Sequence, residues 1–350
     1  MRKFQALSLS AALLASLLLG GCANNAASSD AASSDSAASE PEATPEPTPA
    51  PPAANPLTGA ADADYTGKRP VAVTLRNMTG STPQWGIASA DVLVEGVTEG
   101  TTASLMALYA NPDSIAKAGP VGPARDLLLQ VALPLNAVPV HIDKNIYASN
   151  LLNTLAYQDL DGYHIGKTAF AFDQDRQNAG YAEENCWYTT AELINSGLAS
   201  YGVSLNGDNT PLFQFGERPA VDPADRSGMN LTITFSPDDI DCLNYDTGTG
   251  LYALSNGDGS PVQDADNGQQ VGFTNVFVFY ASSGIKDDGY TRQYDMTAGT
   301  GLYLHGGAWE RINWTKEDAT GPFAITNEAG ETLVVSQGKS FIAIWGGYYG

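Results

Sequence analysis

The spacing of apolar residues predicts interleaved strands and helices from about residue 65 to residue 215. Short β-branched apolar runs are typical of buried strands, and apolar residues three and four apart are typical of helices. We expect strands over 70–77, 90–100, 101–110 and 138–143, and helices over 124–136, 146–156 and 189–202. This pattern predicts a mixed α/β domain, to which we assign residues 55–220.

Two of these helices carry end signals. Pro134 lacks a backbone N–H and should end or break the first helix. Thr189 or Thr190 is placed to cap the start of the last helix, and Gly202 is placed to end it.

Beyond about residue 221 the pattern changes to short alternating runs separated by turns. Strands are expected within 230–236, 250–256, 274–282, 301–316, 322–330 and 331–346. These runs predict an antiparallel β-rich domain over residues 221–350, as a sandwich or an open barrel. The predicted fold class is therefore α+β, with a mixed α/β domain followed by a β-rich domain.

The first 22 residues indicate where the protein resides. Arg2 and Lys3 precede an apolar run, Phe4–Leu19, which is too short for a confident membrane span. The run ends in LGGC, which resembles a bacterial lipobox and predicts lipidation of Cys22. An ordinary cleaved signal peptide with a chance cysteine is the alternative.

Residues 23–54 contain no aromatic and no basic residue and are rich in Ala, Ser, Pro, Asp and Glu. Such a segment cannot bury a core and predicts a disordered tether, spanning roughly 30 Å when coiled and about 100 Å when extended. We expect a domain held by its lipid at the outer face of the cytoplasmic membrane of a Gram-positive bacterium.

The formal net charge of −22 excludes some partners. Nucleic acid is not expected, because phosphate binding needs clustered lysine and arginine. Cations, cationic peptides and neutral glycans remain compatible, and solubility alone would also explain the charge. The three histidines are far apart and match no zinc motif, so no cofactor is expected.

Two cysteines remain after the proposed anchor. Cys186 and Cys242 could form a disulfide in an extracytoplasmic protein, and two free thiols are equally compatible with the sequence. A Cys186 nucleophile with His141 or His164 as its base lacks a recognisable motif and is disfavoured.

Four short motifs occur in the order found in the YerB-like lipoproteins, the DUF3048 family: NPLTG (55–59), RPVAV (69–73), ASADVLVEG (88–96) and AGPVGPARD (118–126). The resemblance implies the same two-part architecture and no established activity. Where that family usually has a second arginine this chain has Gly122, and where it has a His-Asn pair this chain has Glu184-Asn185. A catalytic constellation built on those family residues would be incomplete here.

AGPVGPARD is the strongest ligand-site candidate. Its Gly-Pro pairs predict a rigid turn with accessible amides, and Arg125 at a helix start could clamp a carboxylate or phosphate. Alternatively, Arg125 forms a structural bridge with Asp126, Glu95 or Asp143. The candidate ligand-binding residues are Gly119, Pro120, Gly122, Arg125, Asp126, His141 and Asn185.

Acidic residues form weaker candidates. The pairs Asp159/Asp161 and Asp173/Asp175 have oxygen ligands suited to Ca²⁺ but lack a recognisable calcium-loop spacing. An acid/base or metal role is considered for Glu95, Asp173, Asp175 and Glu184. Five aromatic residues could form a stacking surface or belong to the core: Tyr303, Trp309, Trp314, Tyr348 and Tyr349.

Three functions are compatible with these features. The first is a lipid-anchored binding or scaffolding module for a wall fragment, peptide or partner protein, which fits the absence of a complete catalytic motif. The second is a hydrolase or transferase acting on envelope polymers through the Gly-Pro-Arg turn, His141 and the 173–185 loops. The third, a structural spacer, predicts no pocket. We rank them in that order.

Overall fold

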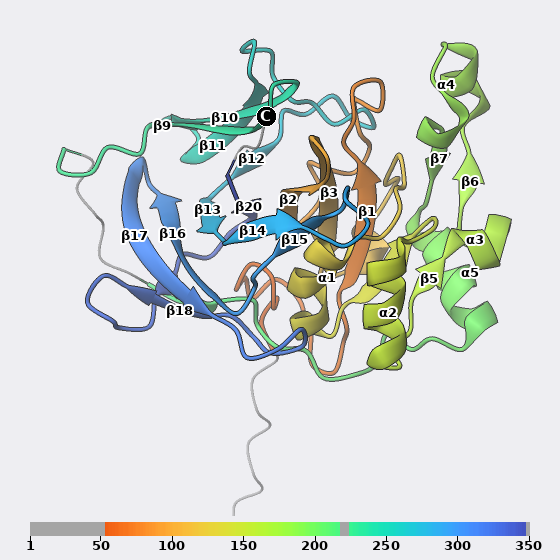
Figure 1. The fold of residues 1–350 in the computed structure, drawn as a ribbon, viewed down its shortest axis with the longest axis horizontal. Coiled ribbons are helices and arrows are strands. Elements are labelled where there is room, and N and C mark those ends of the chain that lie inside the picture. Colours follow the sequence, from red (N-terminus) through yellow and green to blue (C-terminus); the bar gives the residue numbers. More distant parts are fainter. Residues whose placement is uncertain (1–52, 218–223, 348–350) are drawn as a thin grey trace, which may run out of the picture. The chain divides into compact units, whose positions relative to one another are not determined.

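A mixed sheet of ten strands is the largest element in the computed structural model, which describes residues 53–217 and 224–347. Its strands are β1 (Val71–Arg76), β2 (Val92–Glu99), β3 (Thr102–Tyr109), β4 (Val138–His141), β5 (Leu160–Asp161), β13 (Asn275–Tyr280), β16 (Ala298–His305), β17 (Ala308–Thr315), β18 (Ala324–Asn327) and β20 (Ser340–Trp345). The strand order is β18-β17-β16-β13-β20-β2-β3-β1-β4-β5 (Figure 1).

Strand β20 joins the two halves of the chain. It lies between β13 and β2 and is parallel to both, with Ala343 opposite Val278 on one side and Glu95 on the other. We expected two domains meeting near residue 220, but the sheet runs through both. The reason is the apolar sequence SFIAIW, since a strand buried on both faces needs neighbours on both edges.

Four other strands of the second half form a smaller antiparallel sheet in the order β12-β11-β10-β9. These strands are β9 (Asn230–Ser236), β10 (Asp239–Asp246), β11 (Leu251–Asn256) and β12 (Gly272–Phe273). Short pairs are β6 (Ala171–Phe172) with β7 (Trp187–Tyr188), β8 (Gln214–Phe215) with β19 (Val334–Val335), and β14 (Ser283–Ile285) with β15 (Arg292–Tyr294). The α+β class is confirmed, although the β-rich region divides between two sheets instead of forming a separate sandwich or barrel.

The described residues form the three predicted helices and two shorter ones that were not predicted. They are α1 (Asp126–Ala132), α2 (Ile146–Thr154), α3 (Gly162–Ile165), α4 (Gln174–Asn178) and α5 (Ala191–Tyr201), with 3₁₀ turns at Pro112–Ser114, Leu133–Leu135, Gly166–Thr168 and Glu183–Asn185. Helix α1 passes into a 3₁₀ turn before Pro134, and the Thr190 hydroxyl caps α5 by accepting from the Leu193 amide at 3.2 Å. Gly202 ends α5 with φ of 63°. None of the helices in the described ranges is long and apolar enough to cross a membrane.

Both faces of the central strands of the large sheet are buried, and alternate residues supply two cores. In β20, Phe341 and Ala343 pack on one face and Ile342 and Ile344 on the other. The first core also contains apolar residues of the smaller sheet and of α5, whereas the second contains those of α1 and α2. Each fully buried large side chain stabilises the fold by roughly 1.5–3 kcal/mol.

We expect Phe341→Ala to lower the free energy of unfolding by about 3–5 kcal/mol, because its fully buried ring would leave a cavity in the shared strand. Urea denaturation followed by tryptophan fluorescence and by circular dichroism should give one common shift. Ile285→Ala, at a side chain that is 47% exposed, is the control and should change little. Equal losses in the two variants would contradict a central role for β20.

Candidate functional site

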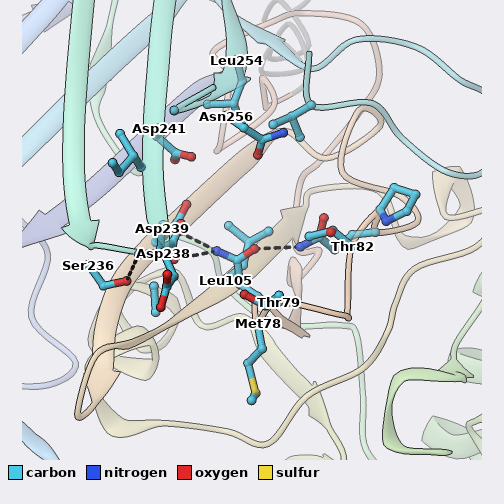
Figure 2. Close-up of a pocket in the computed structure, with 18 of the residues that line it drawn as sticks. Met78, Thr79, Thr82, Leu105, Ser236, Asp238, Asp239, Asp241, Leu254 and Asn256 are labelled. Atoms are coloured by element: carbon cyan, nitrogen blue, oxygen red, sulfur yellow. Dashed lines mark hydrogen bonds between the residues drawn. The ribbon is translucent and has the colours of Figure 1, made fainter. Parts of the chain in front are cut away.

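A cleft of about 730 Å³ opens between the large sheet and the β9–β10 hairpin. One wall is the loop after β1 together with parts of β2 and β3, and the other is residues 236–241 with parts of 254–263. Figure 2 shows Asp238 and Asp239 at the end of the hairpin, Asp241 farther along β10, and Thr82 on the facing loop. The cleft therefore combines segments that are far apart in the sequence.

Three carboxyl groups meet inside this cleft. Glu95 interrupts the apolar run of β2 and is 2% exposed, and Asp241 on β10 is 6% exposed. Asp239 and Asp241 are the two acids close enough to Glu95 to perturb its ionisation. The Asn77 amide donates to Glu95 Oε1 at 2.6 Å and to Asp239 Oδ2 at 3.4 Å, and Gln84 donates to Asn77 Oδ1 at 2.8 Å. Gln84 thus holds the Asn77 N–H groups toward the acids.

Burial keeps protons on this cluster near neutral pH. Burial and the two aspartates raise the pKa of Glu95 well above its usual range. Burial also raises the pKa of Asp239 to about 6 and that of Asp241 to about 7. Carboxyl groups in this condition can transfer protons or exchange them for a cation.

Glu95 is the one sequence-predicted site residue that lines this cleft. Asp239 and Asp241 were missed, although SPDDIDC (236–242) contains a usable signal. Asp241 and Leu243 are both buried on β10, so an aspartate occupies a position where strand alternation calls for an apolar residue. Such a residue is unusual in a strand unless it is functional or paired.

The Gly-Pro-Arg turn is built into the fold. Its amides donate to backbone carbonyls: Gly119 to Trp85 at 3.1 Å, Val121 to Trp187 at 2.8 Å and Gly122 to Thr74 at 2.8 Å. The Gly119–Pro120 peptide is cis, and a Cβ at Gly119 would lie 2.9 Å from the Trp187 carbonyl oxygen. The amides expected to face a ligand therefore hold neighbouring segments together.

Arg125 forms an ion pair, but with a partner that we did not expect. Its Nε and Nη2 atoms lie 2.7 and 2.9 Å from the two oxygens of Glu99. Asp126, which we considered as a partner, pairs with Lys286. Arg125 thus anchors the start of α1 to the end of β2, and its charge is matched within the chain.

His141 belongs to a separate buried cluster. It lies 2.8 Å from the Asp143 carbonyl oxygen and 3.0 Å from Asp159, while Lys144 Nζ lies 2.8 Å from Asp159 and 3.0 Å from Asp161. Burial alone would raise the pKa of Asp159, but hydrogen bonds from His141 and Lys144 lower it to about 2. Within the described ranges, His141, Asp159 and Asp161 converge closely enough for a metal ion. The Lys144 ammonium already supplies the charge that a metal would bring.

The 173–185 residues do not join Glu95. Asp173 caps α4 through the Arg176 amide and pairs with Lys117, while Asp175 and Glu184 are exposed. Asn185 is buried and donates to the Gly80 carbonyl at 3.1 Å. It therefore contacts the loop that forms one wall of the cleft without lining the cleft itself.

Both described cysteines are free thiols. Cys186 is buried, and burial raises the pKa of its thiol, which disfavours a nucleophilic role. Cys242 lies half-buried on β10, and His164 is largely exposed. Cys22 lies outside the described residues.

The predicted aromatic surface is mostly core. Tyr303 and Trp314 are each 1% exposed, whereas half-buried Trp309 borders a second cleft of about 700 Å³ beside β16 and β17. Tyr348 and Tyr349 lie outside the described residues.

Comparison with known proteins finds matches along both halves of the chain. Residues 57–204 match the family described as "Protein of unknown function (DUF3048) N-terminal domain", and residues 231–342 match its C-terminal domain. A Bacillus subtilis (strain 168) protein named "Putative lipoprotein YerB" is 27% identical over 274 residues, 74% of this chain and 78% of that protein. The crystal structure of YerB from Bacillus subtilis shares the fold, with a TM-score of 0.73, 24% identity and coverage of 84% of this chain and 97% of that one.

We expect the free energy of unfolding of Asp241→Asn to fall less steeply with rising pH than that of the parent. A carboxyl whose folded pKa exceeds its unfolded value of about 3.9 ionises first in the unfolded chain. The parent therefore loses up to about 1.4 kcal/mol per pH unit per such group from about pH 4 to pH 7. The variant should be the more stable protein above neutral pH, as measured by urea denaturation.

Asp238→Asn is the matched control, because Asp238 lines the same cleft but is exposed. Its pH slope should follow that of the parent. If Asp241→Asn kept the parent's slope as well, a proton held by the buried cluster would be ruled out.

Proposed function

This chain belongs to the DUF3048 family, as its motif order predicted, and we propose that it is an extracytoplasmic lipoprotein that binds a polar fragment of the cell envelope in the Glu95 cleft. The name of its Bacillus subtilis relative supports a lipoprotein. LGGC, ending at Cys22, supplies the residue for a lipid anchor. We place the protein at the outer face of the cytoplasmic membrane of a Gram-positive bacterium, with residues 23–54 as the tether.

The cleft carries this proposal. Its volume of about 730 Å³ lies within the roughly 300–1,000 Å³ typical of small-molecule sites. Buried polar groups are retained at a cost in stability, so a cleft containing Glu95 and Asp241 favours a ligand role over a structural spacer. The scaffolding role toward a partner protein has less support, because these groups lie inside a concavity.

A hydrolase or transferase acting on envelope polymers is the second candidate. The specific support is the raised pKa of Asp239 and Asp241, because an acid that titrates near neutral pH suits proton transfer. In this version Glu95 and the two aspartates act as acid and base, and the Gly-Pro-Arg turn has no direct part.

Binding should be tested with the full-length protein in detergent micelles and soluble glycan–peptide fragments released from purified peptidoglycan. A saturating ligand at about 100 times its Kd should stabilise the folded protein by about 2.7 kcal/mol. Asn77→Ala should lose most of this stabilisation, because the Asn77 amide donates hydrogen bonds to Glu95 and Asp239. Thermal unfolding with and without fragments measures the effect.

Arg125→Gln is the control, since Arg125 pairs with Glu99 and does not line the cleft. It should keep the ligand-induced shift. A shift lost in Arg125→Gln and kept in Asn77→Ala would move the site to the Gly-Pro-Arg turn. Mass spectrometry of the fragments distinguishes the two functions. Unchanged masses support a binder. Fragments that gain the mass of water with the parent protein, but not with Glu95→Gln, support a hydrolase.

A further inference from the structure

The cleft has an unbalanced set of charges. Its lining includes Glu95, Asp238, Asp239, Asp241 and Asp258 but no lysine, arginine or histidine. The basic groups that neutralise acids elsewhere in the described chain, such as Arg125 and Lys144, serve other carboxylates. A ligand that complements this lining therefore brings positive charge.

Asp241 adds an observation independent of the charge count. Its Oδ2 atom is buried, and no amide, hydroxyl or basic group of the described residues donates to it. The group beside Asp241 is another acid, Glu95. The two acids can therefore interact favourably only by sharing a proton. A buried acceptor without a donor destabilises the fold, and does so more when it is charged. The site thus favours a ligand with an N–H donor and a positive charge.

The same molecule shows how two carboxylates hold such a group. In the His141 cluster, the Lys144 ammonium lies 2.8 Å from Asp159 and 3.0 Å from Asp161. There the amine comes from the chain. In the cleft, the acids are comparably buried and no amine of the lining residues reaches them.

We propose that Glu95, Asp239 and Asp241 bind a primary ammonium group carried by the envelope fragment. This inference rests on the proposed function and names the ligand's chemical class. An ammonium has three N–H donors, and two of them can be taken up by neighbouring carboxylates of this cluster, as Lys144 is by Asp159 and Asp161. The ammonium then replaces the shared proton. The Asn77 amide holds Glu95 and Asp239 in place, and the remaining cleft volume accommodates the rest of the fragment.

A divalent metal ion fits less well. Among the described residues, the acidic or histidine side chains that converge closely enough for one ion are those of the His141 cluster, not those of the cleft. A cleft of about 730 Å³ is also far larger than an ion needs. Ca²⁺ is therefore used as a competing probe, not as the expected ligand.

Isothermal titration calorimetry with the full-length protein in detergent micelles, near pH 7, tests this directly. The probes are Nα-acetyl-lysine amide against its Nε-acetylated form, and glucosamine against N-acetylglucosamine. A free amine should bind at least about tenfold more tightly than its acetylated partner, a difference of about 1.4 kcal/mol, because only the free amine forms charged hydrogen bonds to the carboxylates. The lysine and sugar pairs distinguish a peptide amine from an amino sugar.

Glu95→Gln and Asp241→Asn should each abolish the preference for the free amine. Asp113→Asn removes the same charge at an exposed position outside the cleft and should keep it. Affinity for the amine should rise from about pH 5 to pH 7, because the buried acids must release protons before they can bind a cation. The titratable groups that line the cleft are Glu95, Asp238, Asp239, Asp241 and Asp258.

Two results would overturn the inference while leaving the proposed function intact. In the first, peptidoglycan fragments bind in the cleft, but the free and acetylated probes bind equally well or do not bind at all. The second is binding of Ca²⁺ alone, lost in Asp241→Asn, without binding of either amine. If neither fragments nor amines bind any form of the protein, the proposed function fails as well.

Discussion

The insertion of β20 between β13 and β2 is the constraint on which the rest of the structure depends. Ser340–Trp345 is apolar and almost completely buried, so it needs a hydrogen-bonded neighbour on each edge and a packed layer on each face. Meeting that need fixes the register of β2, with Glu95 opposite Ala343. It also joins β13 to the N-terminal strands. The smaller sheet lies between β8 and β13 in the chain, and it packs over the face of β20 that carries Phe341 and Ala343. The cleft is the gap where this second layer does not fully close.

The two buried acidic clusters show opposite solutions to one electrostatic problem. Around His141, the chain provides Lys144, and the pKa of Asp159 falls to about 2 despite burial. Around Glu95, the chain provides neutral amides from Asn77 and Gln84, and the acids retain protons. The carboxyl groups of the second arrangement are destabilised by ionisation, and they open to the cleft. This cost to the fold at neutral pH is what the proposed ligand would offset.

Local features of this fold could be predicted from the sequence, and long-range ones could not. The caps of α5 and the strands β1, β2 and β3 depend on residues within a few positions of one another. The position of β20 depends on partners more than 60 residues away along the chain, which no local pattern encodes. The same limit applies to the site. Glu95 was recognisable as an acid in an apolar run, but its meeting with Asp239 and Asp241 follows from how two sheets pack.

The residues that the sequence singled out have a definable relation to the cleft. Arg176 donates to the carbonyl oxygens of Ser81 and Pro83, and Asn185 donates to that of Gly80, so the 173–185 segment holds the loop that forms one wall. That loop also carries Gln84, which orients Asn77 toward the acids. Asn185, which follows a departure from the family pattern at Glu184, is thus a positioning residue one contact removed from the cleft. The motif ASADVLVEG contains Glu95, whereas its neighbours Asp239 and Asp241 are recognisable only as buried charge.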